Sequence, residues 1–97
     1  MPIKPSMFLT NHALVLIQIW REPDLTVRAI AESVGITERA TFRILKDLLA
    51  RGCVTRRREG RRNHYVVQES VRLRHPLVAE YEISELLKAL GGAQGHS

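Results

Sequence analysis

The residues with the clearest chemistry are arginines clustered between positions 51 and 64. They are Arg51, Arg56, Arg57, Arg58, Arg61 and Arg62. Only Glu59 opposes them, so this stretch carries a net charge of +5, which equals the formal net charge of the whole chain. The charged side chains elsewhere therefore cancel. A cluster this local creates a positive potential that attracts polyanions, and it predicts nucleic acid as the first candidate partner.

Outside this cluster, no set of reactive side chains has the spacing of a catalytic or metal site. The four histidines are scattered, no nucleophile has a suitably spaced partner, and there is no glycine-rich phosphate loop. Cys53 is the single cysteine, so we expect an inert small hydrophobic residue and not a disulfide partner, a metal ligand or a redox-active thiol. His64 is predicted to be a polar strand residue and not a pH switch. We therefore predict no enzymatic activity, no metal and no cofactor.

The size and composition of the chain limit its class. Its 97 residues, 44% of them apolar, suffice for one domain with a small core, and no linker indicates a second domain. The sequence predicts neither a signal peptide nor a membrane-spanning run of about 20 apolar residues. We therefore expect a cytoplasmic protein that associates with the nucleoid.

An apolar segment predicts the first helix, over residues 11–21. Its β-branched residues also fit a strand, but the N-cap candidates Thr10 and Asn11 and the helix stop at residues 21–24 favour a helix. Almost every side of this helix is apolar, so almost every side must be covered. Because a domain this small has few elements to do so, we expect a second copy of the chain to cover part of it.

Two further helices follow at close spacing. Thr26 is the expected N-cap of a helix over residues 26–34, and Gly35 supplies the left-handed conformation that ends it. Thr37 is the expected N-cap of the next helix, which runs to Ala50. Two helices joined by a tight turn within about 25 residues indicate a helix-turn-helix.

The third predicted helix has an apolar side and a basic side. At about 100° per residue, its apolar side comprises Ala40, Thr41, Ile44, Leu45 and Leu48. Its opposite side comprises Arg39, Arg43 and Lys46, with Phe42 at the margin. On an isolated helix such a basic side would simply be solvated. Beside the arginine cluster, it favours a surface for nucleic acid.

Residues 53–67 have the pattern of a β-hairpin, with apolar ends and a polar middle. We predict a two-residue turn at Glu59-Gly60, although a longer loop would shift the register. The pairs that this turn places opposite each other are Arg58 with Arg61 and Arg57 with Arg62. Like charges directly opposite destabilise a hairpin by a few tenths to about 1 kcal/mol. This register therefore predicts that a bound anion offsets the repulsion.

The last predicted helix begins near Pro76, which suits a first helical turn, and ends at Gly91-Gly92. The residues between the hairpin and this helix form a connector. We expect the first and last helices to form a two-fold interface between two copies of the chain. The candidate interface residues are Leu14, Ile17, Trp20, Tyr81, Ile83, Leu86, Leu87 and Leu90.

The order of these elements resembles the winged helix-turn-helix of bacterial transcription regulators of the MarR/ArsR type. The segments that carry the resemblance are residues 26–32, 34–37, 45–52 and the basic part of the hairpin, 56–62. The resemblance spans residues 11–67 and implies a mainly α fold with one small β-hairpin, the wing, residues 53–67. This sequence departs from the family pattern at two positions. Many members have an aliphatic residue where this chain has Thr41, and a small polar residue where it has Phe42. The cysteine-rich helix motif of the metal-sensing ArsR-like members is absent from this sequence.

The resemblance also implies domain bounds. They are an N-terminal arm at residues 1–9, a DNA-binding domain at 10–67, a connector and dimerisation helix at 68–90, and a disordered tail at 91–97. In this fold the third helix lies in the major groove of duplex DNA, and the wing contacts the backbone or the minor groove. The candidate base readers are Thr37, Arg39, Phe42 and Arg43, and the other candidate DNA contacts are Lys46, Arg56, Arg57, Arg58, Arg61 and Arg62.

The implied function is a homodimeric, sequence-specific DNA-binding regulator of transcription. A small-molecule effector, if there is one, would bind in the cleft between the two copies, since the chain leaves no room for a sensor domain. Two alternatives stay open at this point. One is a winged-helix module for protein assembly, and the other is a protein that binds structured RNA.

Overall fold

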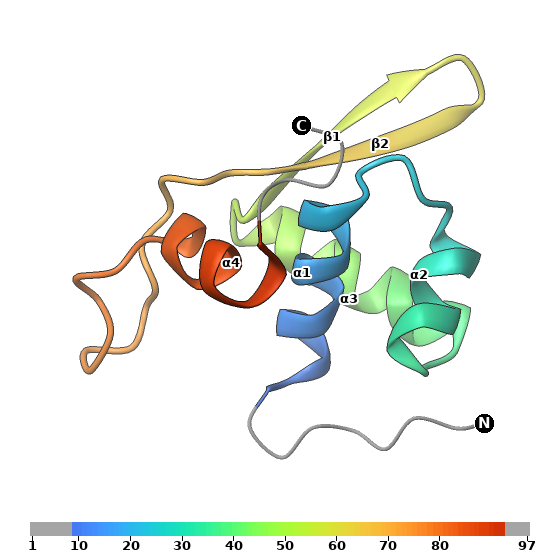
Figure 1. The fold of residues 1–97 in the computed structure, drawn as a ribbon. Helices are drawn as coiled ribbons and strands as arrows, with labels where there is room; N and C mark the ends of the chain where they lie inside the picture. The colour runs from blue at the N-terminus through green and yellow to red at the C-terminus, as the bar shows by residue number, and fades with distance from the viewer. Residues whose placement is uncertain (1–8, 93–97) are drawn as a thin grey trace.

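The computed structural model describes residues 9–92 as four helices and one two-stranded antiparallel hairpin (Figure 1). The helices are α1 (Asn11–Arg21), α2 (Val27–Val34), α3 (Glu38–Ala50) and α4 (Ile83–Gly91), and the strands are β1 (Val54–Glu59) and β2 (Arg62–Val67). The hairpin extends away from the helices, whereas α4 lies on the other side of α1 from α2 (Figure 1). This is the winged helix-turn-helix that the sequence predicts.

Threonines begin α1, α2 and α3, as predicted. The hydroxyls of Thr10, Thr26 and Thr37 accept hydrogen bonds from the backbone N–H groups three residues later, at 3.1, 3.1 and 3.0 Å. Each bond satisfies one of the N–H groups that a first helical turn leaves without a partner. Gly35 then ends α2 in the left-handed conformation, at a φ of 88°. These caps set where α2 ends and where α3 begins.

The central helix, α1, is buried by its own chain. Its apolar residues Val15, Leu16, Ile17, Ile19 and Trp20 are each at most 9% exposed. The other three helices and β2 surround it. Most of α1 is therefore covered within the single chain, by α4, β2 and the other helices, and only half-buried residues such as Leu14 leave a part that a second copy could cover.

The predicted apolar side of α3 is confirmed. Thr41, Ile44, Leu45 and Leu48 are buried against the core. The hydroxyl of Thr41 donates to the backbone carbonyl of Thr37 at 2.9 Å, so the side chain is fully buried without an unsatisfied polar group. Thr41 therefore serves as a packing residue in a position where an aliphatic one is more usual.

The hairpin is present, but its turn lies one residue later than predicted. Glu59 pairs with Arg62, so the turn residues are Gly60 and Arg61. Gly60 has a φ of 61° and Arg61 does not have a positive φ, which fits a type II′ turn with glycine first. In this register no arginine faces another, since Arg58 pairs with Asn63 and Arg57 with His64. The predicted arginine pairs, and the anion between them, are therefore wrong.

The last helix also begins later than predicted, at Ile83 and not near Pro76. Two backbone carbonyls of the connector accept hydrogen bonds from its first N–H groups. The Val71 carbonyl accepts from the Ile83 N–H at 2.8 Å, and the Glu69 carbonyl accepts from the Ser84 N–H at 3.1 Å. In addition, the Glu85 carboxylate accepts from the Glu82 N–H at 3.3 Å, as in a capping box. These bonds fix the start of α4, and residues 74–81 form bends and turns instead.

The C-terminal end of α4 is held against α1. The indole N–H of Trp20 donates to the Gly92 carbonyl at 3.0 Å. A Cβ at Gly91 would lie 3.1 Å from the Trp20 ring, so the glycine allows this close approach. Gly91 and Gly92 therefore belong to the packed domain, whereas residues 1–8 of the predicted arm and 93–97 of the predicted tail lie outside the described residues. None of the helices in residues 9–92 has the length and apolar character needed to cross a bilayer.

Candidate nucleic-acid interface

The exposed side of α3 carries the predicted basic residues. Arg39, Arg43 and Lys46 are exposed, and so is Phe42, at 55%. Thr37 is exposed as well, and its hydroxyl oxygen caps the helix. The structure therefore brings all five predicted residues of this helix to one surface, with the apolar side of α3 turned into the core.

The wing has two different faces, because side chains alternate along each strand. In the observed register, one face carries Arg56, Arg58 and Asn63 next to the buried Tyr65, and the other carries Arg57, Glu59, Arg62 and His64. We call the first the open face and the second the clasped face. The open face borders α3, and the clasped face borders the turn between α1 and α2.

A groove of about 440 Å³ lies between α3 and the open face of the wing. It is lined by Phe42, Leu45, Lys46 and Leu49 of α3 and by Arg56, Asn63 and Tyr65 of the wing. Its floor is apolar, and the cations Lys46 and Arg56 stand on opposite sides of it. Among residues 9–92, no carboxylate lines this groove. The third helix and the wing thus present positive charge around a shared hollow.

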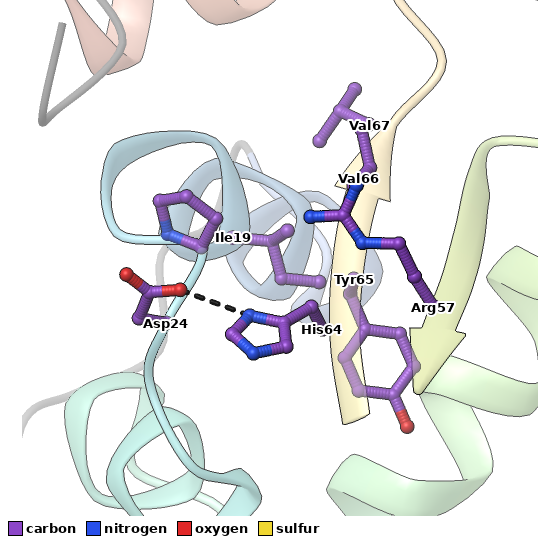
Figure 2. A pocket seen from close by; sticks show the side chains of 8 residues that line it. Ile19, Asp24, Arg57, His64, Tyr65, Val66 and Val67 are labelled. Atoms are coloured by element: carbon purple, nitrogen blue, oxygen red, sulfur yellow. Dashed lines mark ion pairs between the residues drawn. The ribbon is translucent and has the colours of Figure 1, made fainter. Parts of the chain in front are cut away.

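The clasped face, in contrast, is bound to the turn between α1 and α2 (Figure 2). The His64 Nδ1 atom lies 2.9 Å from the Asp24 Oδ1 atom, and the His64 Nε2 atom lies 3.1 Å from the Glu59 Oε1 atom. Arg62 donates from Nη2 to the Asp24 carbonyl at 2.8 Å. The Arg57 Nη2 atom lies 3.2 Å from the Glu59 Oε2 atom. On this face every cation therefore has a partner within the chain.

The remaining cations of the predicted interface differ from these. Arg58 donates from Nε to the Gly60 carbonyl at 3.2 Å, within its own turn. Among residues 9–92, no partner takes a hydrogen bond or an ion pair from the side chains of Arg39, Arg43, Lys46, Arg56 and Arg61. Of the ten predicted DNA-binding residues, the two on the clasped face are thus engaged with carboxylates or a carbonyl from the chain itself.

Neither carboxylate of α3, Glu38 or Asp47, lines this groove, and Asp47 is bound to α1. The His12 Nε2 atom of α1 lies 3.0 Å from the Asp47 Oδ2 atom. This hydrogen bond lowers the pKa of Asp47, and the nearby charges of His12, Arg51 and Arg43 lower it further. The pair ties the start of α1 to the middle of α3, so it supports the helix that presents the basic side.

Sequence reasoning missed Asp24, Glu59 and His64 as parts of this region. A turn at Gly60-Arg61 would have placed Glu59 opposite Arg62 and His64 opposite Arg57, so the register was the available signal. Asp24 gives no signal, because its contacts come from a strand far along the chain. Cys53 is half-buried at the base of the wing and is a free thiol. Residues 9–92 contain no group of three His, Cys, Asp or Glu side chains placed to hold a metal ion.

The predicted interface between two copies divides into two parts. Ile17, Trp20, Ile83 and Leu87 are buried within the single chain. Tyr81 and Leu90 are exposed, and Leu14 and Leu86 are half-buried. The most exposed apolar side chain nearby is Leu77, at 81%. Only the second group is therefore open to another molecule.

A comparison with protein families agrees with this architecture. A family model described as MarR family matches residues 8–62, which is more than half of the chain. No curated protein matches the chain. Among solved structures, it is similar to the zinc-dependent MarR family transcriptional regulator AdcR in the Zn(II)-bound state, with 19% identity and a TM-score of 0.49 over 67% of this chain and 47% of that one. The chain thus spans about half the length of that regulator. By the family match, which covers α1, α2, α3 and the strand β1, this chain belongs to the MarR family.

Proposed function

We propose that this chain is a sequence-specific regulator of transcription that binds duplex DNA as a homodimer and is not an enzyme. The observation that carries the proposal is the groove in which cations of α3 and of the open face of the wing flank an apolar floor, with no carboxylate of residues 9–92 in its lining. Membership of the MarR family supports the same function. In the complex, α3 lies in the major groove, and the wing contacts the backbone or the minor groove.

The residues divide by what they can recognise. Arg39 and Arg43 can each grip the O6 and N7 atoms of a guanine with two hydrogen bonds, which discriminate between bases by about 1 to 3 kcal/mol. The exposed ring of Phe42 can pack on a thymine methyl group. Lys46 and the wing arginines contact phosphates, which position the protein but carry no sequence information directly.

The homodimer is part of this proposal, and the exposure of the predicted interface residues supports a smaller surface for it than the sequence predicts. We propose that the exposed and half-buried apolar residues Leu14, Tyr81, Leu86 and Leu90 meet their counterparts on the second copy, while the buried ones hold α4 against α1. A two-fold dimer would place two recognition helices in successive major grooves, about 34 to 36 Å apart. The bound site would then be roughly palindromic.

The first experiment measures binding to a random-sequence duplex by fluorescence anisotropy at several salt concentrations. If the dimer meets about eight phosphates, log K falls against log[salt] with a slope near −7. Competition by structured RNA in the same assay separates duplex DNA from RNA as the partner. No binding, or binding that does not respond to salt, would refute the proposal and favour a module for protein assembly.

The second experiment tests base reading. In vitro selection from a random duplex library yields the preferred site, and its symmetry reports the dimer. We expect Arg39→Ala and Arg43→Ala to weaken binding to the selected site about 5-fold to 150-fold, with a much smaller effect on random duplex. An equal loss on both duplexes would show that these arginines only contact phosphate.

A further inference from the structure

The clasped face contains a histidine between two carboxylates. The His64 ring lies 2.9 Å from a carboxylate oxygen of Asp24, in the turn between α1 and α2, and 3.1 Å from one of Glu59, across the hairpin. The His64 side chain is only 18% exposed. Figure 2 shows the ring directed at Asp24, with Arg57 reaching along the neighbouring strand. His64 therefore joins the wing to the helical part of the domain.

The protonation state of the imidazole decides whether both of these contacts are attractive. A neutral imidazole carries a hydrogen on one ring nitrogen and a lone pair on the other. With a carboxylate oxygen near each nitrogen, the neutral ring would turn a lone pair toward one of the anions. The imidazolium has hydrogens on both nitrogens, so both contacts are attractive.

Two arginines also lie near His64, and Arg57, its cross-strand partner, disfavours the imidazolium by like charge. Arg57 pairs with Glu59 and thereby holds that carboxylate in place, and Arg62 holds the Asp24 backbone. The groups of α1 and its following turn that line the same cleft are the apolar Ile19 and Pro23. The two carboxylates are therefore the groups that the ring nitrogens of His64 contact, and the pairing of Arg57 with Glu59 offsets part of the repulsion from Arg57.

We propose that Asp24, Glu59 and His64 form a proton-dependent clasp that fixes the wing in position for DNA, which makes them positioning residues for the function proposed above. The clasp engages only one face of the hairpin. It therefore leaves Arg56 and Arg58 of the open face without a carboxylate partner among residues 9–92, and it restricts the wing before DNA arrives. Ordering a segment in advance reduces the entropy that binding must otherwise overcome.

The clasp predicts a change in DNA affinity opposite to the one that charge alone would cause. The double variant Asp24→Asn/Glu59→Gln removes two negative charges from a surface that binds a polyanion, so charge alone would strengthen binding. If the carboxylates position the wing, binding to a random-sequence duplex becomes weaker, by about threefold to tenfold. The matched control is Glu32→Gln/Glu80→Gln, which makes the same change in charge at exposed residues outside the wing. We expect the control to bind as well as the unchanged chain or slightly better. Unchanged or tighter binding by the first variant would overturn the proposal.

A second measurement does not depend on DNA. Hydrogen exchange of the amides of residues 54–67 in the free protein reports how firmly the wing is held. We expect protection to fall in Asp24→Asn/Glu59→Gln and not in the control. If the chain binds no DNA but this protection falls as expected, the clasp stands and the proposed function fails. If protection is the same in both variants, the clasp is refuted whatever the DNA result.

The role of the proton is tested with His64→Gln and with His75→Gln as its control, since His75 lies in the connector and pairs with no carboxylate among residues 9–92. As rising pH removes the proton of the imidazolium, we expect wing protection and DNA affinity to fall in the unchanged chain and in His75→Gln. His64→Gln should keep low values of both throughout. A pH response that survives in His64→Gln would refute the role of this histidine.

Discussion

The two faces of the wing contain the same kind of side chain in different surroundings. On the clasped face, Arg57 and Arg62 bind groups of the chain itself, at 3.2 and 2.8 Å. On the open face, Arg56 has no such partner among residues 9–92 and stands across a groove from Lys46. The arginine cluster is therefore two surfaces, one that can bind a polyanion at once and one that first holds the wing.

The two faces differ in what a phosphate must displace. On the clasped face, it must take the place of a group of the chain that already binds the arginine. The pair between Arg57 and Glu59 is exposed, and exposed ion pairs stabilise a protein by only about 0 to 1 kcal/mol. A phosphate could therefore draw Arg57 away from Glu59, but it would leave behind an anion that repels the DNA. Within the described part of the chain, Arg56 has no anion beside it on the open face, so its full charge is available.

The largest expected effect comes from removing the open-face arginines. At about 0.15 M salt, each neutralised phosphate contributes about fivefold to affinity through counterion release, so Arg56→Ala/Arg58→Ala should weaken binding to random duplex about 30-fold for each wing that meets DNA. It should also reduce the magnitude of the salt slope by about 1.8 per wing. The matched variant Arg57→Ala/Arg62→Ala should change affinity by about threefold or less, because Glu59 already offsets part of the charge of Arg57 and Arg62 is engaged with the Asp24 carbonyl. Anisotropy titrations that give equal losses for the two variants would remove the distinction between the faces.

Much of this arrangement can be predicted from local sequence signals. Thr10, Thr26 and Thr37 cap their helices in the structure, because each cap needs only a hydroxyl and the N–H three residues on. The apolar side of α3 follows from the helical spacing of apolar residues, which can be read directly from the sequence. These elements are short-range, so the sequence determines them without knowledge of the rest of the chain.

The predictions that were wrong concern features that depend on a distant contact or on a single backbone angle. α4 begins at Ile83 because connector carbonyls meet its N–H groups, a contact that outweighs the helix-starting tendency of Pro76. The wing register depends on whether Gly60 is the first or the second residue of the turn, and that one-residue difference exchanges the partners of every arginine. Asp24 meets the wing only through tertiary structure.

A smaller effect is expected from the turn that sets the register. Gly60 has a φ of 61° and open space around it, so Gly60→Ala adds backbone strain of about 1 kcal/mol or more without a clash. Because the faces depend on this turn, we expect DNA affinity to fall about fivefold. Gly52→Ala is the control, since Gly52 has a φ of 74°, open space and a place at the base of the wing. Both variants should lose similar free energy of unfolding in urea, but only Gly60→Ala should lose affinity. Parallel losses of affinity would mean that stability and not register is responsible.

The smallest effect concerns the other pair of a histidine and a carboxylate, His12 with Asp47, which lies away from the wing. The hydrogen bond from His12 holds the pKa of Asp47 below its ordinary value of 3.8, so the folded state binds this proton less readily than the unfolded state does. The resulting stabilisation is present above pH 3.8 and is lost as the pH falls through the lowered pKa of the folded state. Because this carboxyl is on the surface, we expect the urea midpoint of the unchanged chain to fall only slightly more than that of Asp47→Asn between about pH 5 and pH 3. Hydrogen exchange of the wing near neutral pH should be the same in both proteins. If Asp47→Asn loosened the wing as Asp24→Asn/Glu59→Gln does, wing protection would follow general stability, and the clasped face would have no separate role in holding it.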